Sequence, residues 1–562
     1  SYAQGRLWFL EQLKHGSAPY VLSMAQHVQG RLNTEALRLA FNDLVRRHSI
    51  LRTTFPQISG VPLQRVRAAL EIDLPVIDLR DHDPQQRQVE ALRRARLDAQ
   101  EPFNLADGPL LRARLYLLDE DCHLLLIAAH HMVADGWSVR LIADELAGSY
   151  ARHVQNEAPS AGVPAAQYLQ FARWQREHDA LDTQQASLSY WCQQLSSVPP
   201  VLALPCDHPR PSLPSNRSGR LEFAVGVLPT RLLQDLATQQ RCGLFTVLAA
   251  AYGVLLARFC QQSALAFGTP VAGRNRQEWT DTVGCFVNTV VICIDASGDP
   301  SFLEFLSHVR ETVFDALDHQ DLPFEKIVDA LQPKRDLSRN PLVQASIGLH
   351  NAPGQSPLAS IPLAGTAVTA VDLDAGTVRF DLEFDLWETA DGLHGRLLYA
   401  QDLFDESTMR ALASGFRHLL ESIANSPDRK LSQLALLDQV ERQLIMDSSG
   451  RAQMAPLSQQ TLVGLVVTQA QRTPYAVALT CGASQLSYAG LVAAAYGVTC
   501  ELRAAGCLAG DKVGLCMARG PLAIVAMIGI LGAGLAYVPL DPQYPLARLQ
   551  LVIEDAQLRW AV

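Results

Sequence analysis

The stretch HLLLIAAHHMVADGWSVRLIADELAGSYARH, His123 to His153, decides how the first part of the chain folds. Its first nine residues are an apolar run that ends in two histidines, as is typical of a strand covered on both faces. The chain then turns at Asp135-Gly136, and apolar residues resume at helical spacing. We therefore predict that His130 and His131 lie where a buried strand passes into a helix.

Two adjacent histidines on a strand point to opposite sides, so one can be anchored while the other faces a cavity. An imidazole titrates near neutrality and can accept or relay a proton during attack on a carbonyl, although a purely structural role for the pair stays open. Asp135 can fix the loop through an arginine, and Gly136 can offer its N–H to an oxyanion. A metal site is not favoured, because no H-x-x-x-H or cysteine spacing supplies further ligands.

The residues on either side of this stretch predict more α/β structure. We expect helices at Leu37 to Arg47, Ala91 to Gln100 and Leu244 to Arg258, and strands at Leu110 to Asp119, Leu265 to Gly268 and Phe286 to Ile292. Six prolines between residues 199 and 214 indicate a join between two lobes. A polar tail near residues 426–458 indicates another boundary, after which residues 459–562 read as the start of an α/β sheet.

Composition excludes several classes of function. The formal charge of −10 argues against a nucleic-acid partner, and no lysine lies in a glycine-rich phosphate loop of the Walker type. The 11 cysteines form no C-x-x-C pair, which disfavours a zinc ribbon or a disulfide framework. Since no basic-then-apolar leader precedes Ser1, we expect a cytoplasmic protein. The apolar run Pro521 to Leu540 is interrupted by glycines, so we predict a buried helix and strand and no membrane span.

The motif H-H-x-x-x-D-G at His130 to Gly136 resembles the signature of the condensation domain of nonribosomal peptide synthetases, a family similar in fold to chloramphenicol acetyltransferase. Six further stretches resemble family motifs in family order: SYAQGRLWFL (Ser1 to Leu10), RHSILRTTF (Arg47 to Phe55), YLQFARWQ (Tyr168 to Gln175), VGCFVNTVVI (Val283 to Ile292), HQDLPFEKIV (His319 to Val328) and RDLSRNPLVQ (Arg335 to Gln344). Farther on, QLSYAGL (Gln485 to Leu491) and LGAGLAYVPLDPQYP (Leu531 to Pro545) look like the first two core motifs of an adenylation domain.

The resemblance implies an α/β fold with two acetyltransferase-like lobes in a V-shaped pseudodimer, and a tunnel open at both faces. We expect an N-lobe at residues 1–175, a C-lobe at 176–430, a linker at 431–460, and a truncated α/β adenylation subdomain at 461–562. The family's ATP phosphate loop and lysine-bearing subdomain would lie beyond Val562. The ATP site is therefore expected to be incomplete, and ATP-dependent pyrophosphate exchange by this chain would contradict that expectation.

The implied reaction is amide formation. The α-amine of an acceptor aminoacyl group attacks the thioester of a donor acyl or peptidyl group, each carried on the phosphopantetheine arm of a carrier-protein domain. The expected partners are an upstream donor carrier, a downstream acceptor carrier and the rest of the adenylation domain. No metal and no cofactor bound by the condensation domain itself are expected.

The resemblance also assigns roles to residues. His131, which matches the second histidine, takes the amine proton or holds the amine in line, and Gly136 is an oxyanion donor or a turn residue. The residues expected to support the site are His130, Asp135, Arg274 as the partner of Asp135, and Asn288, while Trp137 and Ser138 line or support the cavity. The chain departs from the family pattern at Ser49, Gln170 and Cys293, where glutamate, aspartate and arginine are common. If the arginine that is common in the family at the position of Cys293 normally braces the active-site loop, Arg274 must do so alone here.

Other members of the superfamily give alternative functions. An epimerisation domain carries the same motif, but it usually follows the carrier of its own module, whereas here an adenylation start comes next. A heterocyclisation domain normally has an aspartate-based motif, and a non-catalytic domain that recruits partners generally lacks the second histidine.

Overall fold

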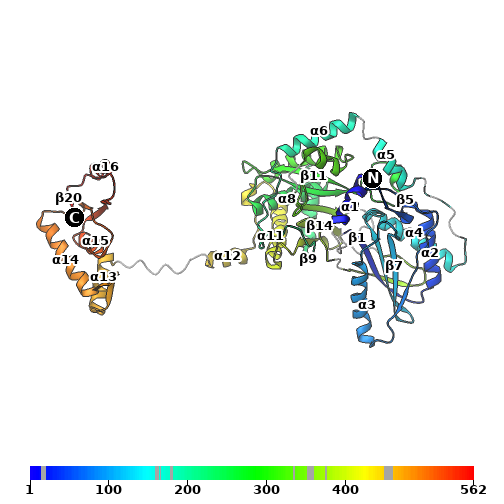
Figure 1. Cartoon of the computed structure of the whole chain (residues 1–562), viewed down its shortest axis with the longest axis horizontal. Coiled ribbons are helices and arrows are strands. Elements are labelled where there is room, and N and C mark those ends of the chain that lie inside the picture. The colour runs from blue at the N-terminus through cyan, green and yellow to red at the C-terminus, as the bar shows by residue number, and fades with distance from the viewer. Residues whose placement is uncertain are drawn as a thin grey trace. The chain divides into compact units, whose positions relative to one another are not determined.

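The computed structural model describes residues 1–13, 20–158, 162, 164, 166–177, 182–332, 336–350, 360–373, 376–448 and 460–562. It divides into two compact units, Ser1–Glu441 and Arg442–Val562, which are described separately (Figure 1). Arg335 of the last condensation motif, and residues 449–459 of the predicted linker, lie outside the described residues.

The first sheet contains the histidine strand. Its order is β13-β1-β8-β7-β6, with bounds β1 (Val21–Gln29), β6 (Val76–Asp78), β7 (Leu111–Asp119), β8 (Cys122–His130) and β13 (Ala367–Val371). Side chains of β8 alternate between two cores: Leu124 and Leu126 join the core that includes alanines of α3 (Pro84–Ala99), whereas Leu125 and Ile127 join that of α2 (Thr34–Arg47) and α4 (Gly136–Val154). Both faces of β8 are therefore covered, as its apolar run predicts.

The second sheet has the order β11-β10-β12-β14-β15-β9. Its strands are β9 (Ser218–Val225), β10 (Ala264–Val271), β11 (Asn288–Asp295), β12 (Ala345–His350), β14 (Leu382–Thr389) and β15 (Gly392–Ala400). The helices α7 (Val227–Gln239), α8 (Leu244–Cys260), α9 (Phe302–Asp318) and α11 (Glu406–Asn425) contribute to the same core. The predicted helix at Leu244 and strand at Leu265 are confirmed as α8 and β10, and the strand predicted from Phe286 begins at Asn288.

One strand joins the two parts of the first unit. β13 lies within the residues predicted for the C-lobe, yet it pairs antiparallel with β1, from Ala25 opposite Val371 to Gln29 opposite Ala367. The predicted boundary at residue 175 puts β1 and β13 in different lobes. A local sequence pattern does not reveal their pairing, because the paired residues are more than 300 positions apart.

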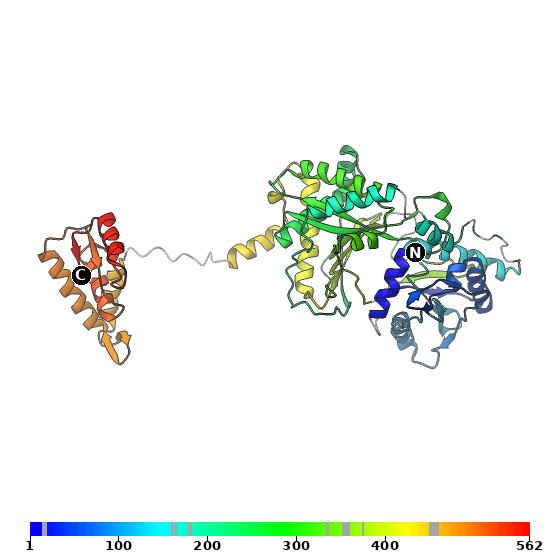
Figure 2. The ribbon, with the colours of Figure 1, turned by 45° about the horizontal axis from the view of Figure 1, so that its top comes forward.

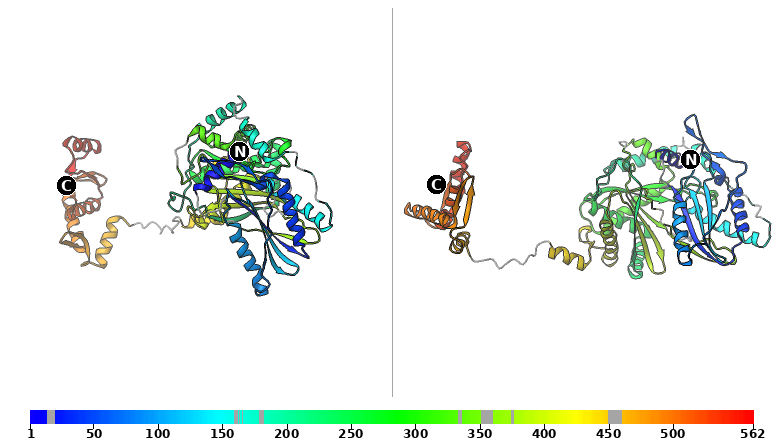
Figure 3. Two further views of the ribbon diagram at one scale, coloured as in Figure 1. Left: turned by 45° about the vertical axis from the view of Figure 1, so that its right-hand side comes forward. Right: turned by 60° about the horizontal axis from the view of Figure 1, so that its bottom comes forward.

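Figure 3 shows the two sheets side by side in the first unit, and Figure 2 shows α1 (Tyr2–Leu13) between them. The remaining elements of this unit are η1 (Ser49–Arg52), β2 (Thr53–Thr54), β3 (Gln57–Ile58), β4 (Val61–Pro62), β5 (Arg65–Val66), α5 (Tyr168–Glu177), α6 (Asp182–Ser196), η3 (Gln277–Trp279), α10 (Phe324–Leu331) and η4 (Leu431–Gln433). The helix α12 (Gln439–Ser448) runs across the boundary between the units.

The second unit has two small sheets and two cores of its own. Its elements are α13 (Leu462–Arg472), β16 (Val477–Cys481), β17 (Ser484–Ser487), α14 (Tyr488–Ala504), β18 (Lys512–Leu515), α15 (Pro521–Gly532), β19 (Ala536–Pro539), α16 (Leu546–Ala556) and β20 (Trp560–Ala561). The prediction of a helix and then a strand for Pro521 to Leu540 is confirmed by α15 and β19. Among the described helices, no single one has the length and apolarity to cross a membrane; α7 and α8 together do by length and composition, but they are bent by 107°.

Candidate active site

His131 follows the last residue of β8 and lines a cavity of about 930 Å³, a volume that includes its open mouth. The other walls come from α1, from α10 and from β10, β11, β12 and β14 of the second sheet. The backbone N–H of His131 donates to the carbonyl of Tyr20 at 2.8 Å, and the residue is half-buried. What remains exposed of this imidazole therefore faces the cavity.

The surroundings of His131 keep its imidazole neutral. Burial, the Arg379 guanidinium and His130 lower its pKa to about 3, although a hydrogen bond with the backbone of Ala134 acts the other way. At pH 7 the ring has one N–H donor and one acceptor nitrogen, and it can receive a hydrogen bond from an amine.

His130 is anchored at the end of β8. It is 2% exposed, its Nδ1 accepts the N–H of Met132 at 3.1 Å, and its Nε2 lies 3.4 Å from Oε1 of Glu11. The edge of the ring meets Phe103, with centroids 6.1 Å apart. All of these contacts hold the end of β8 in place.

Asp135 caps α4 and pairs with Arg274. Its Oδ1 accepts the N–H of Ser138 at 2.8 Å, its Oδ2 accepts the N–H of Phe286 at 2.9 Å, and Nη2 of Arg274 donates to the two oxygens at 3.1 and 3.3 Å. Both side chains of the ion pair are 3% exposed. The partner expected from the sequence therefore lies in contact, and among the described residues it is the sole cation paired with Asp135.

Arg274 also holds the loop that precedes β11. Its Nη1 donates to the carbonyls of Trp279 and Thr282, both at 2.6 Å, and its guanidinium lies over the ring of Phe286 at 4.0 Å. The ion pair thus joins the residue before α4 to the loop between β10 and β11.

Ser138 and Trp137 support this loop from the first turn of α4. The Ser138 hydroxyl is fully buried, lies 2.7 Å from Oδ1 of Asp135 and 2.8 Å from the carbonyl of Gly284, and accepts the Gly284 N–H at 3.0 Å. Nε1 of Trp137 donates to the carbonyl of Thr280 at 3.0 Å. Gly136 is exposed at the start of α4, and neither it nor Trp137 nor Ser138 is among the residues lining the His131 cavity.

Asn288 lies at the start of β11 and lines the cavity. Its Nδ2 donates to the carbonyls of Gln320 and Leu322, both at 2.8 Å, and its Oδ1 accepts the N–H of Phe324 at 3.0 Å. These bonds fix the segment that leads into α10.

Three carboxylates that the sequence reasoning did not single out lie along β14 and the residue before it. Asp381, Glu383 and Asp385 alternate with apolar residues of the second core. Each pairs with an arginine: Arg210 with Asp381, Arg379 with Glu383, and Arg396 with Asp385. The spacing of these three residues in the sequence is a usable signal, because acidic residues at every second position of a strand require partners when that face is buried.

Two of these groups, Arg379 and Asp385, line the His131 cavity. Burial alone would raise the pKa of Asp385, but the hydrogen bond with His350 at 3.0 Å and the charges of Arg396 and Arg379 outweigh it and hold that pKa far below its usual range. The cavity therefore has a charged end formed by the second sheet.

A second cavity of about 580 Å³, a volume that also includes its open mouth, adjoins the first. The two share the lining residues Ala3, Cys285, Val287, Asn288 and Glu325. The second is bordered by aromatic side chains, Phe171, Trp174, Trp279 and Phe286. Residues 285, 287 and 288 therefore border both cavities.

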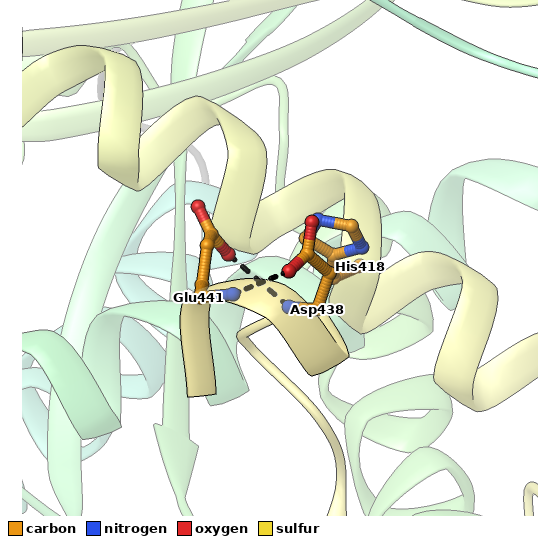
Figure 4. Close-up of side chains that lie close together, drawn as sticks. All are labelled: His418, Asp438 and Glu441. Atoms are coloured by element: carbon orange, nitrogen blue, oxygen red, sulfur yellow. Dashed lines mark hydrogen bonds between the residues drawn. The ribbon is translucent and has the colours of Figure 1, made fainter. Parts of the chain in front are cut away.

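A group of potential metal ligands, His418, Asp438 and Glu441, has ligand atoms within 4.8 Å of one another (Figure 4). The N–H of Asp438 donates to Oε2 of Glu441 at 3.1 Å, and the N–H of Glu441 donates to Oδ1 of Asp438 at 2.7 Å. This is the reciprocal pattern of a capping box, with an aspartate in the N-cap position of α12. Helix capping thus accounts for the proximity of the two carboxylates.

Comparisons with known proteins extend over the whole chain. Residues 1–446 match the family model described as a condensation domain, and residues 466–562 match the one described as an AMP-binding enzyme. One of the linear gramicidin synthase proteins of Brevibacillus parabrevis is 38% identical over 99% of the chain, and a dimodular nonribosomal peptide synthase of Bacillus subtilis is 34% identical over 99%. The chain spans only 11% and 24% of the lengths of these two relatives.

Solved structures give the same result. The holo form of a four-domain nonribosomal peptide synthetase, bound to AMP and glycine, is similar with a TM-score of 0.83 at 26% identity, over 100% of this chain and 43% of that one. The X-domain from teicoplanin biosynthesis is similar with a TM-score of 0.71 at 28% identity, over 77% of this chain and 96% of that one.

Proposed function

Because the chain belongs to the condensation-domain family of nonribosomal peptide synthetases, followed by an AMP-binding segment, we propose that its first unit forms amide bonds. The donor is a carrier-bound acyl or peptidyl thioester, and the acceptor is the α-amine of a carrier-bound aminoacyl group. The observation that carries the proposal is the neutral imidazole of His131, which faces a cavity between the two sheets.

In the reaction the amine nitrogen attacks the thioester carbonyl carbon. An α-amine has a pKa of about 8, so roughly a tenth of it is neutral at pH 7. His131 accepts a hydrogen bond from that neutral amine and holds it in line with the carbonyl. The low pKa of His131 favours this positioning role over full removal of the proton before attack.

The remaining site residues hold this geometry. His130 anchors the end of β8, while the Asp135–Arg274 pair and Ser138 tie α4 to the loop before β11. Gly136 stays a candidate for an oxyanion donor, although the cavity wall at His131 does not include it.

We interpret the two sheets as the two acetyltransferase-like lobes and the adjoining cavities as the approaches for two phosphopantetheine arms. The lobes are assigned to residues 1–175 and 176–430, with the segment at 360–373 contributing its strand to the first sheet. A linker at 431–460 and an adenylation segment at 461–562 complete the proposed order.

Recruitment of a partner protein is a second candidate, because the teicoplanin X-domain, solved also as a complex with OxyB, is similar in fold. A further alternative is proton transfer at the α-carbon, as in an epimerisation domain. The retained second histidine, with open space beside it, favours catalysis over recruitment alone.

The test uses donor and acceptor carriers loaded with labelled substrates, mixed with the wild-type chain, His131→Ala or His153→Ala. His153 is a matched control, because it pairs with Asp43 at 2.7 Å and is not among the cavity residues. We expect intact mass spectrometry to show amide for wild type and His153→Ala, and roughly 10²- to 10⁴-fold slower formation for His131→Ala.

Three results would contradict the proposal. Equal product from wild type and His131→Ala would remove this histidine from the mechanism. Exchange of the α-hydrogen without an amide would favour epimerisation, and binding of carriers without either product would favour recruitment.

A further inference from the structure

We propose that Arg379 is the hydrogen-bond donor that stabilises the oxyanion of the reacting carbonyl, on the side of the cavity formed by the second sheet. This inference rests on the proposed amide-forming function and adds a residue to its chemistry. It starts from two observations: Glu383 holds the guanidinium along one edge, and the exposed Arg379 side chain lines the cavity.

Glu383 holds the guanidinium in one orientation. Oε2 of this glutamate accepts hydrogen bonds from Nη2 and Nε of Arg379, at 2.8 and 3.3 Å. Its Oε1 accepts the backbone N–H groups of Arg379 and Phe380. The Glu383 side chain is 3% exposed, so the carboxylate cannot leave this position without losing buried hydrogen bonds.

Arg379 itself is not buried. Its side chain is 44% exposed, and the residue lines the His131 cavity. Among the hydrogen bonds of the described residues, none uses its Nη1. A planar guanidinium held along one edge by a carboxylate offers its other N–H groups in a fixed direction, which suits recognition of an oxygen.

The carboxylates near Arg379 and along the cavity wall are each paired with a cation, so among the described residues no unpaired negative charge there opposes a developing anion. Glu383 is its direct partner, and Asp385 on the same strand is already engaged by His350 and Arg396. From the other elements around the cavity, Tyr20 and His131 are electrostatically coupled to Arg379, and neither carries a negative charge at neutral pH.

The chemistry places one group on each side of the carbonyl. As the amine nitrogen forms the C–N bond, the carbonyl π electrons move to oxygen, and this oxyanion accepts hydrogen bonds from Arg379. When the oxyanion collapses, the C–S bond breaks and its electron pair leaves on the pantetheine sulfur. The proton lost by the amine passes through His131 to that thiolate, so the step needs no other reactant.

Arg379 also meets a requirement that the histidine motif leaves unfilled. An oxyanion donor must lie within hydrogen-bond distance of the carbonyl oxygen. Gly136, the donor suggested by the sequence, is exposed outside the cavity wall, whereas Arg379 belongs to it.

The first test compares wild type, Arg379→Gln, Arg379→Lys and Arg210→Gln in the full chain with loaded carriers. Arg210 is a matched control, because it forms a bidentate ion pair with Asp381 in the same segment and is not among the residues lining the cavity. We expect Arg379→Gln to lower kcat by about 10² to 10³ with little change in KM, as for loss of one oxyanion donor. Arg379→Lys keeps the charge and should recover part of this loss, while Arg210→Gln should keep a kcat close to that of wild type.

A second readout does not require turnover. The ¹³C carbonyl stretch of bound acetyl-pantetheine thioester is recorded with His131→Ala and with the double variant His131→Ala, Arg379→Gln. Donation by Arg379 polarises the carbonyl, so the band should lie at lower frequency when Arg379 is present.

The outcomes separate the two proposals. If the carbonyl band shifts but the wild-type chain forms no amide, the Arg379 contact is supported and the proposed amide formation is contradicted. Three results would overturn the assignment of Arg379. In the first, the wild type is active and Arg379→Gln has the same kcat; in the second, Arg379→Gln and Arg210→Gln lose equal activity. In the third, the carbonyl band does not shift.

Discussion

Asp135 combines two functions in one carboxylate, since it caps α4 and neutralises Arg274. Asp135→Asn separates them, because asparagine caps a helix about as well as aspartate but leaves Arg274 buried without its counter-ion. We expect a loss of about 3–5 kcal/mol in the free energy of unfolding of the first unit. Urea unfolding followed by tryptophan fluorescence measures it.

Asp83→Asn is the matched control for this prediction. Asp83 is the exposed N-cap of α3, where it accepts the N–H of Gln85 at 2.9 Å. The same substitution should change stability there by less than about 0.5 kcal/mol. Equal small effects at both positions would show that the ion pair with Arg274 does not stabilise the unit.

His131 gives the stability of the first unit a specific dependence on pH. The pKa of His131 in the folded protein is about 3, below the ordinary 6.5. Between these values the unfolded chain binds a proton at this residue and the folded chain does not. The stabilising contribution is complete above pH 6.5 and is lost as pH falls toward 3. Compared with His131→Asn, wild type should lose up to about 1.4 kcal/mol more per pH unit in that range.

Urea midpoints of the two proteins at several pH values provide the measurement, and parallel curves would contradict a depressed pKa. The rate of amide formation should follow the acceptor amine instead. It should rise with pH toward a pKa of about 8 and show no inflection near the ordinary pKa of histidine.

How much of the site was predictable depends on the range of the contacts. The alternation along β8 predicted that one histidine is anchored while the other faces a cavity, and the resemblance to the family assigned these places to His130 and His131. The structure places Arg274 beside the buried Asp135, which required a cation. The contact of Arg379 with the same cavity was not predictable, because it depends on how the segment before β14 lies relative to the end of β8 in space.

At the scale of elements, Gly284 permits the contact between the loop before β11 and α5. A Cβ built there would lie 2.0 Å from Cδ2 of Tyr168, whose hydroxyl donates to the carbonyl of Cys285 at 2.6 Å. Gly284→Ala should therefore destabilise the first unit by about 1–3 kcal/mol or more, and it should slow amide formation by displacing the bonds to Ser138.

Gly148→Ala in α4 is the control for this steric effect. A Cβ there would meet Arg152 at 3.7 Å, an ordinary contact, and alanine should stabilise the helix by up to about 1 kcal/mol. Thermal midpoints of the two variants should thus move in opposite directions. A Gly284→Ala variant as stable as wild type would contradict the close packing on Tyr168.

Elements defined by local pattern were predicted well from the sequence. The apolar run and the Asp-Gly turn gave β8 and α4, and glycine punctuation gave α15 and β19. β13 was missed because a five-residue strand at a sheet edge carries little local signal, and its partner β1 lies near the start of the chain.

At the scale of the whole molecule, the cores of the two units share no residue. A chain of residues 1–448 should therefore keep the unfolding transition of the first unit. Calorimetry should show one transition unchanged in midpoint and the transition of the second unit absent. A clearly lower midpoint for residues 1–448 would show that the second unit stabilises the first.

The crossing strand β13 has a practical consequence for chimeras built from halves of condensation-family domains. A chimera cut cleanly near residue 175 would bring in an edge strand selected for a different neighbour, and the new β1 would have to accept foreign side chains along five paired positions. A chimera that takes residues 360–373 together with the N-terminal half keeps the native pairing of β13 with β1. The smallest exchangeable piece is therefore discontinuous in sequence.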